Sequence, residues 1–153
     1  MKISWILLGA GLIPMVCAAQ TVRVGTFDKQ AIVVAFYRSP IWADVLKAKM
    51  AEMETAKKAN DVRKIEELNA WGGKQQELAH QQVTGDAPIT NILEALAPAF
   101  PAIAEKAQVT MIVPDLPYAN GTVQKVDVTD PLLEWLKADA ATRKTVEDLR
   151  KQR

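Results

Sequence analysis

The stretch Ser39–Asp61, SPIWADVLKAKMAEMETAKKAND, decides the fold because it carries a start signal, a helical stripe and a stop signal. A serine can accept a hydrogen bond from the first free amides of a helix, and proline is tolerated at the first helical position. An apolar face follows at the spacing of helical turns: Trp42, Leu46, Met50 and Met53. The pattern predicts one helix that begins at Pro40 and stops near residues 59–61.

A second helix is predicted directly after this stop. Asn60 suits the left-handed position at a helix end, and Asp61 can cap the next helix. Helices 40–58 and 62–83 are comparable in length, so they form an antiparallel hairpin. Gly72-Gly73 offers a rival tip, because each glycine costs a helix interior about 1 kcal/mol relative to alanine. We place the tip at the first site and expect the glycine pair to be a kink or a close-packing point.

Upstream of the hairpin, a strand and a short helix are predicted. Thr21–Phe27 alternates apolar and polar residues, which is typical of a strand with one buried face. Asp28 can cap the element that follows it. The apolar run Lys29–Tyr37 is too short to span a membrane and is compatible with a helix or a strand. We interpret it as a short buried helix.

Downstream of the hairpin, residues 84–88 break the helical pattern, and an apolar stripe then runs to Ala107. Pro98 and Pro101 lie inside this stripe, and an interior proline costs a helix about 3 kcal/mol. The helix must therefore kink or restart. Residues 108–113, QVTMIV, predict the second strand.

The stretch 124–137, QKVDVTDPLLEWLK, changes from a strand period to a helical one. Val126 and Val128 share one face of a strand, and Thr129 or Asp130 is predicted to cap a closing helix with Pro131 at its first position. The fold class is therefore predicted as α+β and mostly helical, with a small β body and a projecting antiparallel hairpin over residues 40–83.

The two ends of the chain are expected to lie outside this domain of residues 20–137. Residues 1–19 combine Lys2, an apolar run and two small residues, which predicts a cleaved export signal rather than a membrane span. Lipidation at Cys17 is the less favoured alternative. Residues 138–153 form a modestly basic tail with a thin apolar face, and we interpret it as a frayed, solvated helix rather than a binding arm.

Charge and cysteine content exclude some classes of function. Cleavage after Ala19 removes one basic residue and leaves 18 basic and 18 acidic side chains, so no net charge favours nucleic acid. The same cleavage removes the single cysteine of the chain, so the exported fold must be held together by packing.

No catalytic constellation is predicted. His80 is the single histidine and has no second metal ligand nearby, and Ser39 is better explained as a helix cap than as a nucleophile. Asp127 and Asp130 are interpreted as capping residues rather than as an acid/base pair, and no glycine-rich phosphate loop is present. We therefore expect a protein that is not an enzyme and that has no cofactor and no metal.

Four short segments occur in a familiar order: Val24–Asp28, Ser39-Pro40, Val109–Val113 and Asp127–Asp130. With the export signal and the hairpin, this order resembles the Skp/OmpH family of periplasmic chaperones. The resemblance implies a homotrimer with a small β body, hairpins that project as tentacles, and a cavity that holds unfolded outer-membrane proteins without ATP. The hairpin is shorter here, and the strong positive charge expected on the tentacles is missing.

The contact residues predicted for such clients lie on the first arm and the tip: Met50, Met53, Lys57, Lys58 and Val62. Methionine and lysine side chains make an adaptable amphipathic surface, although packing inside the hairpin would also explain the methionines. The expected function is a periplasmic holdase for unfolded envelope proteins. The alternative is a non-enzymatic adaptor whose hairpin docks one folded partner.

Overall fold

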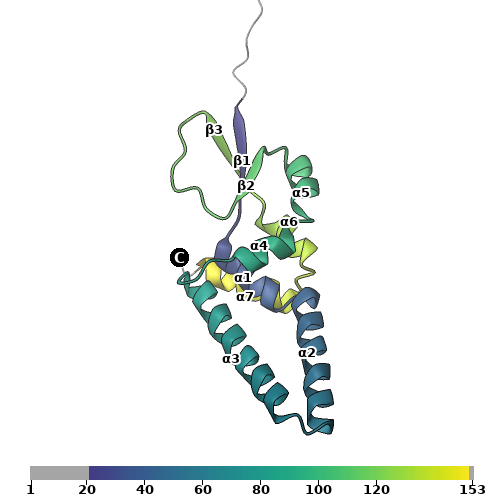
Figure 1. Ribbon diagram of the computed structural model, residues 1–153. Helices are drawn as coiled ribbons and strands as arrows, with labels where there is room; N and C mark the ends of the chain where they lie inside the picture. The colour runs from purple at the N-terminus through teal and green to yellow at the C-terminus, as the bar shows by residue number, and fades with distance from the viewer. Residues whose placement is uncertain (1–20, 152–153) are drawn as a thin grey trace, which may run out of the picture.

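The computed structural model describes residues 21–151, and the predicted export signal lies outside the described residues. Figure 1 shows a small sheet and a group of helices from which a long helical hairpin projects. The elements follow in this order: β1 (Val22–Thr26), α1 (Lys29–Tyr37), α2 (Pro40–Lys58), α3 (Val62–Thr84), α4 (Thr90–Leu96), α5 (Phe100–Ala107), β2 (Met111–Val113), β3 (Val123–Asp127), α6 (Thr129–Trp135) and α7 (Ala140–Lys151). The predicted class, α+β and mostly helical, is confirmed.

The three strands form one parallel sheet in the order β2-β1-β3. They run the same way because the chain returns along the sheet after β1 through the connection α1 to α5, and after β2 through residues 114–122. Gly25 is in register with Ile112 and Val126 on the face that joins the core. The parallel sheet does not match the Skp/OmpH-like body that the resemblance implied.

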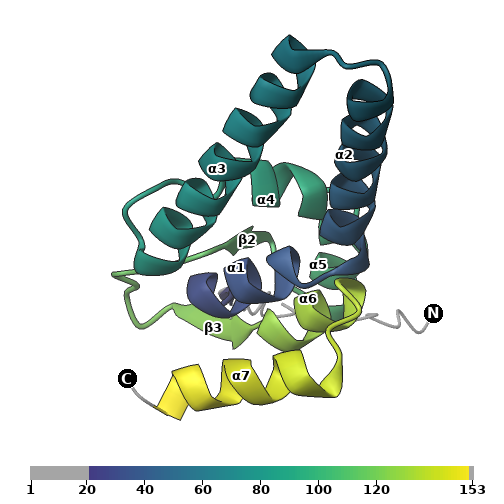
Figure 2. The same cartoon turned by 90° about the horizontal axis from the view of Figure 1, so that it is seen from below.

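Helix α1 lies at the centre of the molecule, against α3, α6 and α7 (Figure 2). Four of its nine residues are completely buried: Ala31, Ile32, Val33 and Ala35. The predicted short buried helix is therefore confirmed. The Asp28 carboxylate caps it by accepting a hydrogen bond from the Ala31 N–H at 3.0 Å. An apolar segment too short for a membrane has therefore become the core helix.

The start of α6 differs from the prediction. The cap position is Val128, which has no side-chain capping bond, so neither Thr129 nor Asp130 caps the helix. The Thr129 hydroxyl instead accepts a hydrogen bond from the Asp28 N–H at 2.9 Å, and the Thr129 N–H donates to Asp127 at 2.8 Å. Thr129 is completely buried, so it joins the end of β3 to the start of α1.

The prolines split the third helical stretch, as predicted. Helix α4 ends at Leu96 and α5 begins at Phe100. Gln108 ends α5 in the left-handed region, at φ 53°, and this turn leaves only Met111–Val113 for the second strand. The strand predicted over residues 108–113 is therefore shorter than expected.

The C-terminal segment is a packed helix, so the prediction of a frayed, solvated tail is wrong. Helix α7 lies against α1, and Thr142 and Val146 are each 3% exposed. The thin apolar face of α7 is sufficient for packing, because α1 is apolar on every side and another element must cover it at this position. At the start of α7, the Thr142 N–H donates a hydrogen bond to the Asp139 carboxylate at 2.7 Å.

This capping bond makes the stability of α7 depend on pH. Hydrogen bonds from Thr142, its backbone N–H first, hold the pKa of Asp139 below its usual value. Because the folded pKa is the lower one, the stabilisation is present above the unfolded pKa of about 4 and is lost as pH falls through the folded pKa. As pH falls from about 4 through the folded pKa, we expect the melting temperature of the wild type to fall more steeply than that of Asp139→Asn, whose amide oxygen caps without titrating. Parallel pH profiles measured by circular dichroism would contradict this prediction.

Candidate functional site

The hairpin starts and turns at the predicted residues. The Ser39 hydroxyl accepts from the Trp42 N–H at 3.4 Å and donates to the Phe36 carbonyl at 2.7 Å, so the start of α2 is tied to the end of α1. Asn60 is left-handed at φ 54°, and Asp61 accepts from the Lys64 N–H at 3.0 Å. The tip at residues 59–61 is confirmed.

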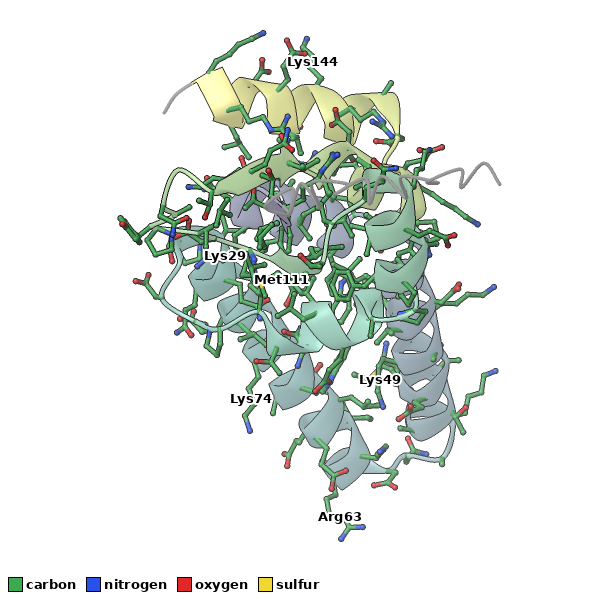
Figure 3. The ribbon with its side chains drawn as sticks, turned by 90° about the horizontal axis from the view of Figure 1, so that it is seen from above. Lys29, Lys49, Arg63, Lys74, Met111 and Lys144 are labelled. Atoms are coloured by element: carbon green, nitrogen blue, oxygen red, sulfur yellow. The ribbon has the colours of Figure 1, made fainter. Side chains whose placement is uncertain are left out.

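A row of aromatic rings joins the two arms of the hairpin to the core. Trp42 of α2 stacks on Trp71 of α3, with ring centroids 6.1 Å apart and an angle of 24° between planes. Tyr37 packs edge-on against Trp42 at 5.0 Å and against Phe36 at 5.2 Å. The Lys49 ammonium lies 5.8 Å from the Trp71 ring, and Figure 3 shows this lysine between the arms.

A buried glutamine fixes the base of the hairpin. The Gln82 amide accepts a hydrogen bond from the Tyr37 hydroxyl at 2.9 Å and donates to the Pro88 carbonyl at 2.7 Å and to Asn91 at 2.6 Å. Gln82 is completely buried, and burial also raises the pKa of Tyr37. The network connects α1, α3 and α4, so the base of α3 cannot leave α1 without breaking it.

Beside the tryptophan pair lies a groove of about 270 Å³, which we call the aromatic groove. Its lining consists of Tyr37, Trp42, Leu46, Trp71, Gly72, Gln75, Gln76 and Ala79. Leu46 is 40% exposed, and nothing lies within 4 Å of where a Gly72 side chain would begin. The groove therefore offers an apolar floor that is open to solvent, with two glutamine amides at its rim.

The glycine pair has neither of the roles predicted for it. Helix α3 runs as one element from Val62 to Thr84 through both glycines. No atom lies within 4 Å of the added side chain at Gly72 or at Gly73, so no close packing requires them. Gly72 instead lines the aromatic groove, which stays open there because glycine has no side chain.

A second hollow, of about 620 Å³, lies nearer the tip, and we call it the alanine groove. Its lining consists of Ala48, Ala51, Glu52, Thr55, Ala56, Ala59, Asp61 and Lys64. The Glu52 carboxylate accepts from Lys49 at 2.7 Å and lies 3.6 Å from Lys64. The hydrogen bond from Lys49 holds the pKa of Glu52 below its usual value, so this side chain is charged and is already paired.

The contact residues predicted from the sequence lie elsewhere on the hairpin. Met50 is 69% exposed and Val62 is 64% exposed, whereas Met53 is partly buried. Lys57 is paired with Glu54 at 3.2 Å, and Lys58 is exposed. None of these five lines either groove.

Sequence reasoning missed the α3 side of the aromatic groove. The signal was present, because Trp71, Gln75 and Ala79 recur every four residues on one helical face. From the sequence alone, packing inside the hairpin also explains Trp71, and the glutamines are typical of a polar surface. The two arms diverge toward the body, as Figure 1 shows, and Trp71 is only partly buried between them.

The residues weighed for catalysis have structural contacts. Ser39 is buried, and its hydroxyl forms hydrogen bonds at the start of α2. His80 is exposed on α3. Asp127 accepts from the Thr129 N–H and lies 3.9 Å from Arg150. Within residues 21–151, no three His, Cys, Asp or Glu side chains are placed so that they could hold a metal ion.

Comparison with protein-family models, curated proteins and solved structures gives no match to this chain. In the described part of the chain, no helix is both long enough and apolar enough to cross a bilayer. The site is therefore interpreted from its own geometry.

Proposed function

We propose that this protein binds apolar segments of other proteins in the aromatic groove of its hairpin, and that it is a non-catalytic holdase for unfolded proteins of the cell envelope. The groove itself carries the proposal: two partly buried tryptophans and an exposed leucine lie beside glutamine amides on a projecting element. In the described residues, four of the seven exposed large apolar side chains are also on the hairpin: Val45, Leu46, Met50 and Val62.

The size and lining of the groove suit shallow, repeated contacts. A volume of about 270 Å³ takes one or two apolar side chains rather than a folded surface. Each buried apolar side chain contributes about 1.5–3 kcal/mol, so one engagement is weak and reversible. The glutamine rim can hydrogen-bond the backbone of an extended segment in many registers.

Unfolded outer-membrane β-barrel proteins are the client class that fits this groove. Their strands alternate apolar and polar residues, so an extended segment presents single apolar side chains between polar ones. No nucleotide is needed, since the clients' exposed apolar surface supplies the driving force. The kinship with the Skp/OmpH chaperones rests on the order of the elements, and the parallel sheet speaks against it, so the proposal does not depend on that kinship.

The adaptor function is the second candidate, and the rigidity of the groove favours it. Gln82 and the stacked tryptophans fix the groove before any partner arrives, as in a site shaped for one ligand. An adaptor would bind one folded partner at saturation and would show no preference for unfolded chains.

The test is suppression of aggregation of a urea-denatured β-barrel protein at stoichiometric ratios. Leu46→Glu places a charge in the groove, and we expect it to reduce suppression at least tenfold. The matched control is Ala43→Glu, because Ala43 is exposed on the same helix and lines neither groove. Absence of suppression by the wild type, or equal losses in the two variants, would overturn the proposal.

A further inference from the structure

One face of α2 is uncovered along most of the helix. Val45, Ala48, Ala51, Thr55 and Ala59 are all exposed. Four of them line the alanine groove, and Val45 extends it toward the body. Their steps of three and four residues place all five on one helical face, which we call the seam of α2. Small residues along such a seam allow another helix to approach closely.

The charges beside this seam have a symmetric arrangement. Asp44 and Lys58 lie seven residues before and seven residues after Ala51, so all three share one side of the seam. Both charged residues are exposed, and neither forms an ion pair with another residue of the described range 21–151. A helix with opposite charges at equal distances from its centre is complementary to an antiparallel copy of itself.

We propose that the alanine groove and the seam of α2 bind a second copy of this chain, with two α2 helices packed antiparallel about a two-fold axis at Ala51. Such an interface is isologous, so each contact occurs twice. Asp44 of each copy then faces Lys58 of the other, whereas a parallel pair would oppose Asp44 to Asp44. The charges therefore select the antiparallel dimer.

One acidic residue, Glu52, lies beside the seam, and with the axis at Ala51 it comes to lie nearest to Ala51 of the second copy. Its carboxylate is held by Lys49 and Lys64 of its own chain, at 2.7 and 3.6 Å. Packing against a second helix therefore covers a paired charge rather than an isolated one. The small Ala51 of the second copy leaves space for the stem of this side chain.

The dimer is expected to be reversible. One helix of 19 residues from each copy makes a smaller interface than the roughly 1,600 Å² of a standard stable complex. The contact is independent of the proposed client site, because the alanine groove and the aromatic groove share no residue. A dimer with no holdase activity, or holdase activity without a dimer, would separate the two proposals.

The experiment is sedimentation velocity of the purified protein over a hundredfold range of concentration. We expect a monomer–dimer equilibrium that Ala51→Glu weakens at least tenfold, because it places two carboxylates at the two-fold axis. Ala43→Glu, the same substitution on the outer side of α2, is expected to leave the equilibrium unchanged. A monomer at every concentration, a concentration-independent trimer, or equal effects of the two variants would overturn the proposal.

A charge exchange tests the register. Asp44→Lys and Lys58→Glu are each expected to weaken self-association, since each creates two like-charge contacts in the dimer. Mixing these two variants restores dimers, because both contacts in the mixed pair again join opposite charges. Failure of the mixture to associate better than either variant alone would exclude the antiparallel register. Circular dichroism of each variant verifies that α2 remains helical.

Discussion

Replacing Gln82 with leucine is expected to lower the free energy of unfolding by about 3 kcal/mol, although leucine has nearly the same volume. The change leaves the Tyr37 hydroxyl without its acceptor and the Pro88 carbonyl and Asn91 amide without their donor. A buried polar group that loses its partner costs about 1–3 kcal/mol, and partial access to water reduces the cost for Tyr37 and Asn91. Urea denaturation followed by circular dichroism measures the change.

The control for this substitution is Gln81→Leu, at the neighbouring residue of α3. The Gln81 side chain donates only to Glu77 on the surface, at 2.7 Å, so its replacement should change stability by less than about 0.5 kcal/mol. Similar losses in the two variants would show that helix propensity, rather than the buried network, decides the result. A loss below about 1 kcal/mol for Gln82→Leu would mean that the network does not fix the base of the hairpin.

Gly25→Val is expected to cost about 3 kcal/mol, although valine is normally favoured in strands. A side chain begun at Gly25 would lie 3.1 Å from Ile112 and 3.3 Å from both Val109 and Val128. These neighbours come from two segments on opposite sides of β1, residues 109–112 and Val128, so relief of one contact tightens another. The two methyl groups of valine extend further into this space, and thermal or urea unfolding measures the resulting loss.

Gly73→Ala is expected to have the opposite effect on stability. Nothing lies within 4 Å of the added carbon, and Gly73 is inside α3, so alanine should raise stability by about 1 kcal/mol. If Gly25→Val and Gly73→Ala changed the free energy of unfolding in the same direction, the packing explanation would be contradicted. Destabilisation by Gly73→Ala would restore the structural role for the glycine pair that the sequence suggested.

The hairpin was predictable because its signals are local. Ser39, Asn60 and Asp61 act through hydrogen bonds or backbone conformations within three residues of themselves, so no knowledge of the rest of the fold was needed. The same holds for Asp28 at the start of α1 and for the prolines that separate α4 from α5.

The errors arose where the partner of a residue is distant in the sequence. Thr129 was expected to cap its own helix, but its hydroxyl binds Asp28, 101 residues earlier. The α7 segment has little apolar surface of its own, and it is buried because it covers a side of α1 that would otherwise face solvent. The aromatic groove depends on the angle between α2 and α3. The stacking of Trp42 on Trp71 joins the two arms, and the Gln82 network holds the base of α3.

The sequence by itself determined where the hairpin of this protein begins, turns and ends, and where the third helical stretch is interrupted. Those features depend on capping, proline geometry and apolar period, which act within one turn of the chain. The tertiary structure alone decided that the strands are parallel, that the C-terminal helix is buried and that the hairpin carries two separate grooves. These properties depend on which surfaces meet across many residues, and the free energy of such packing belongs to the assembled faces rather than to any one segment.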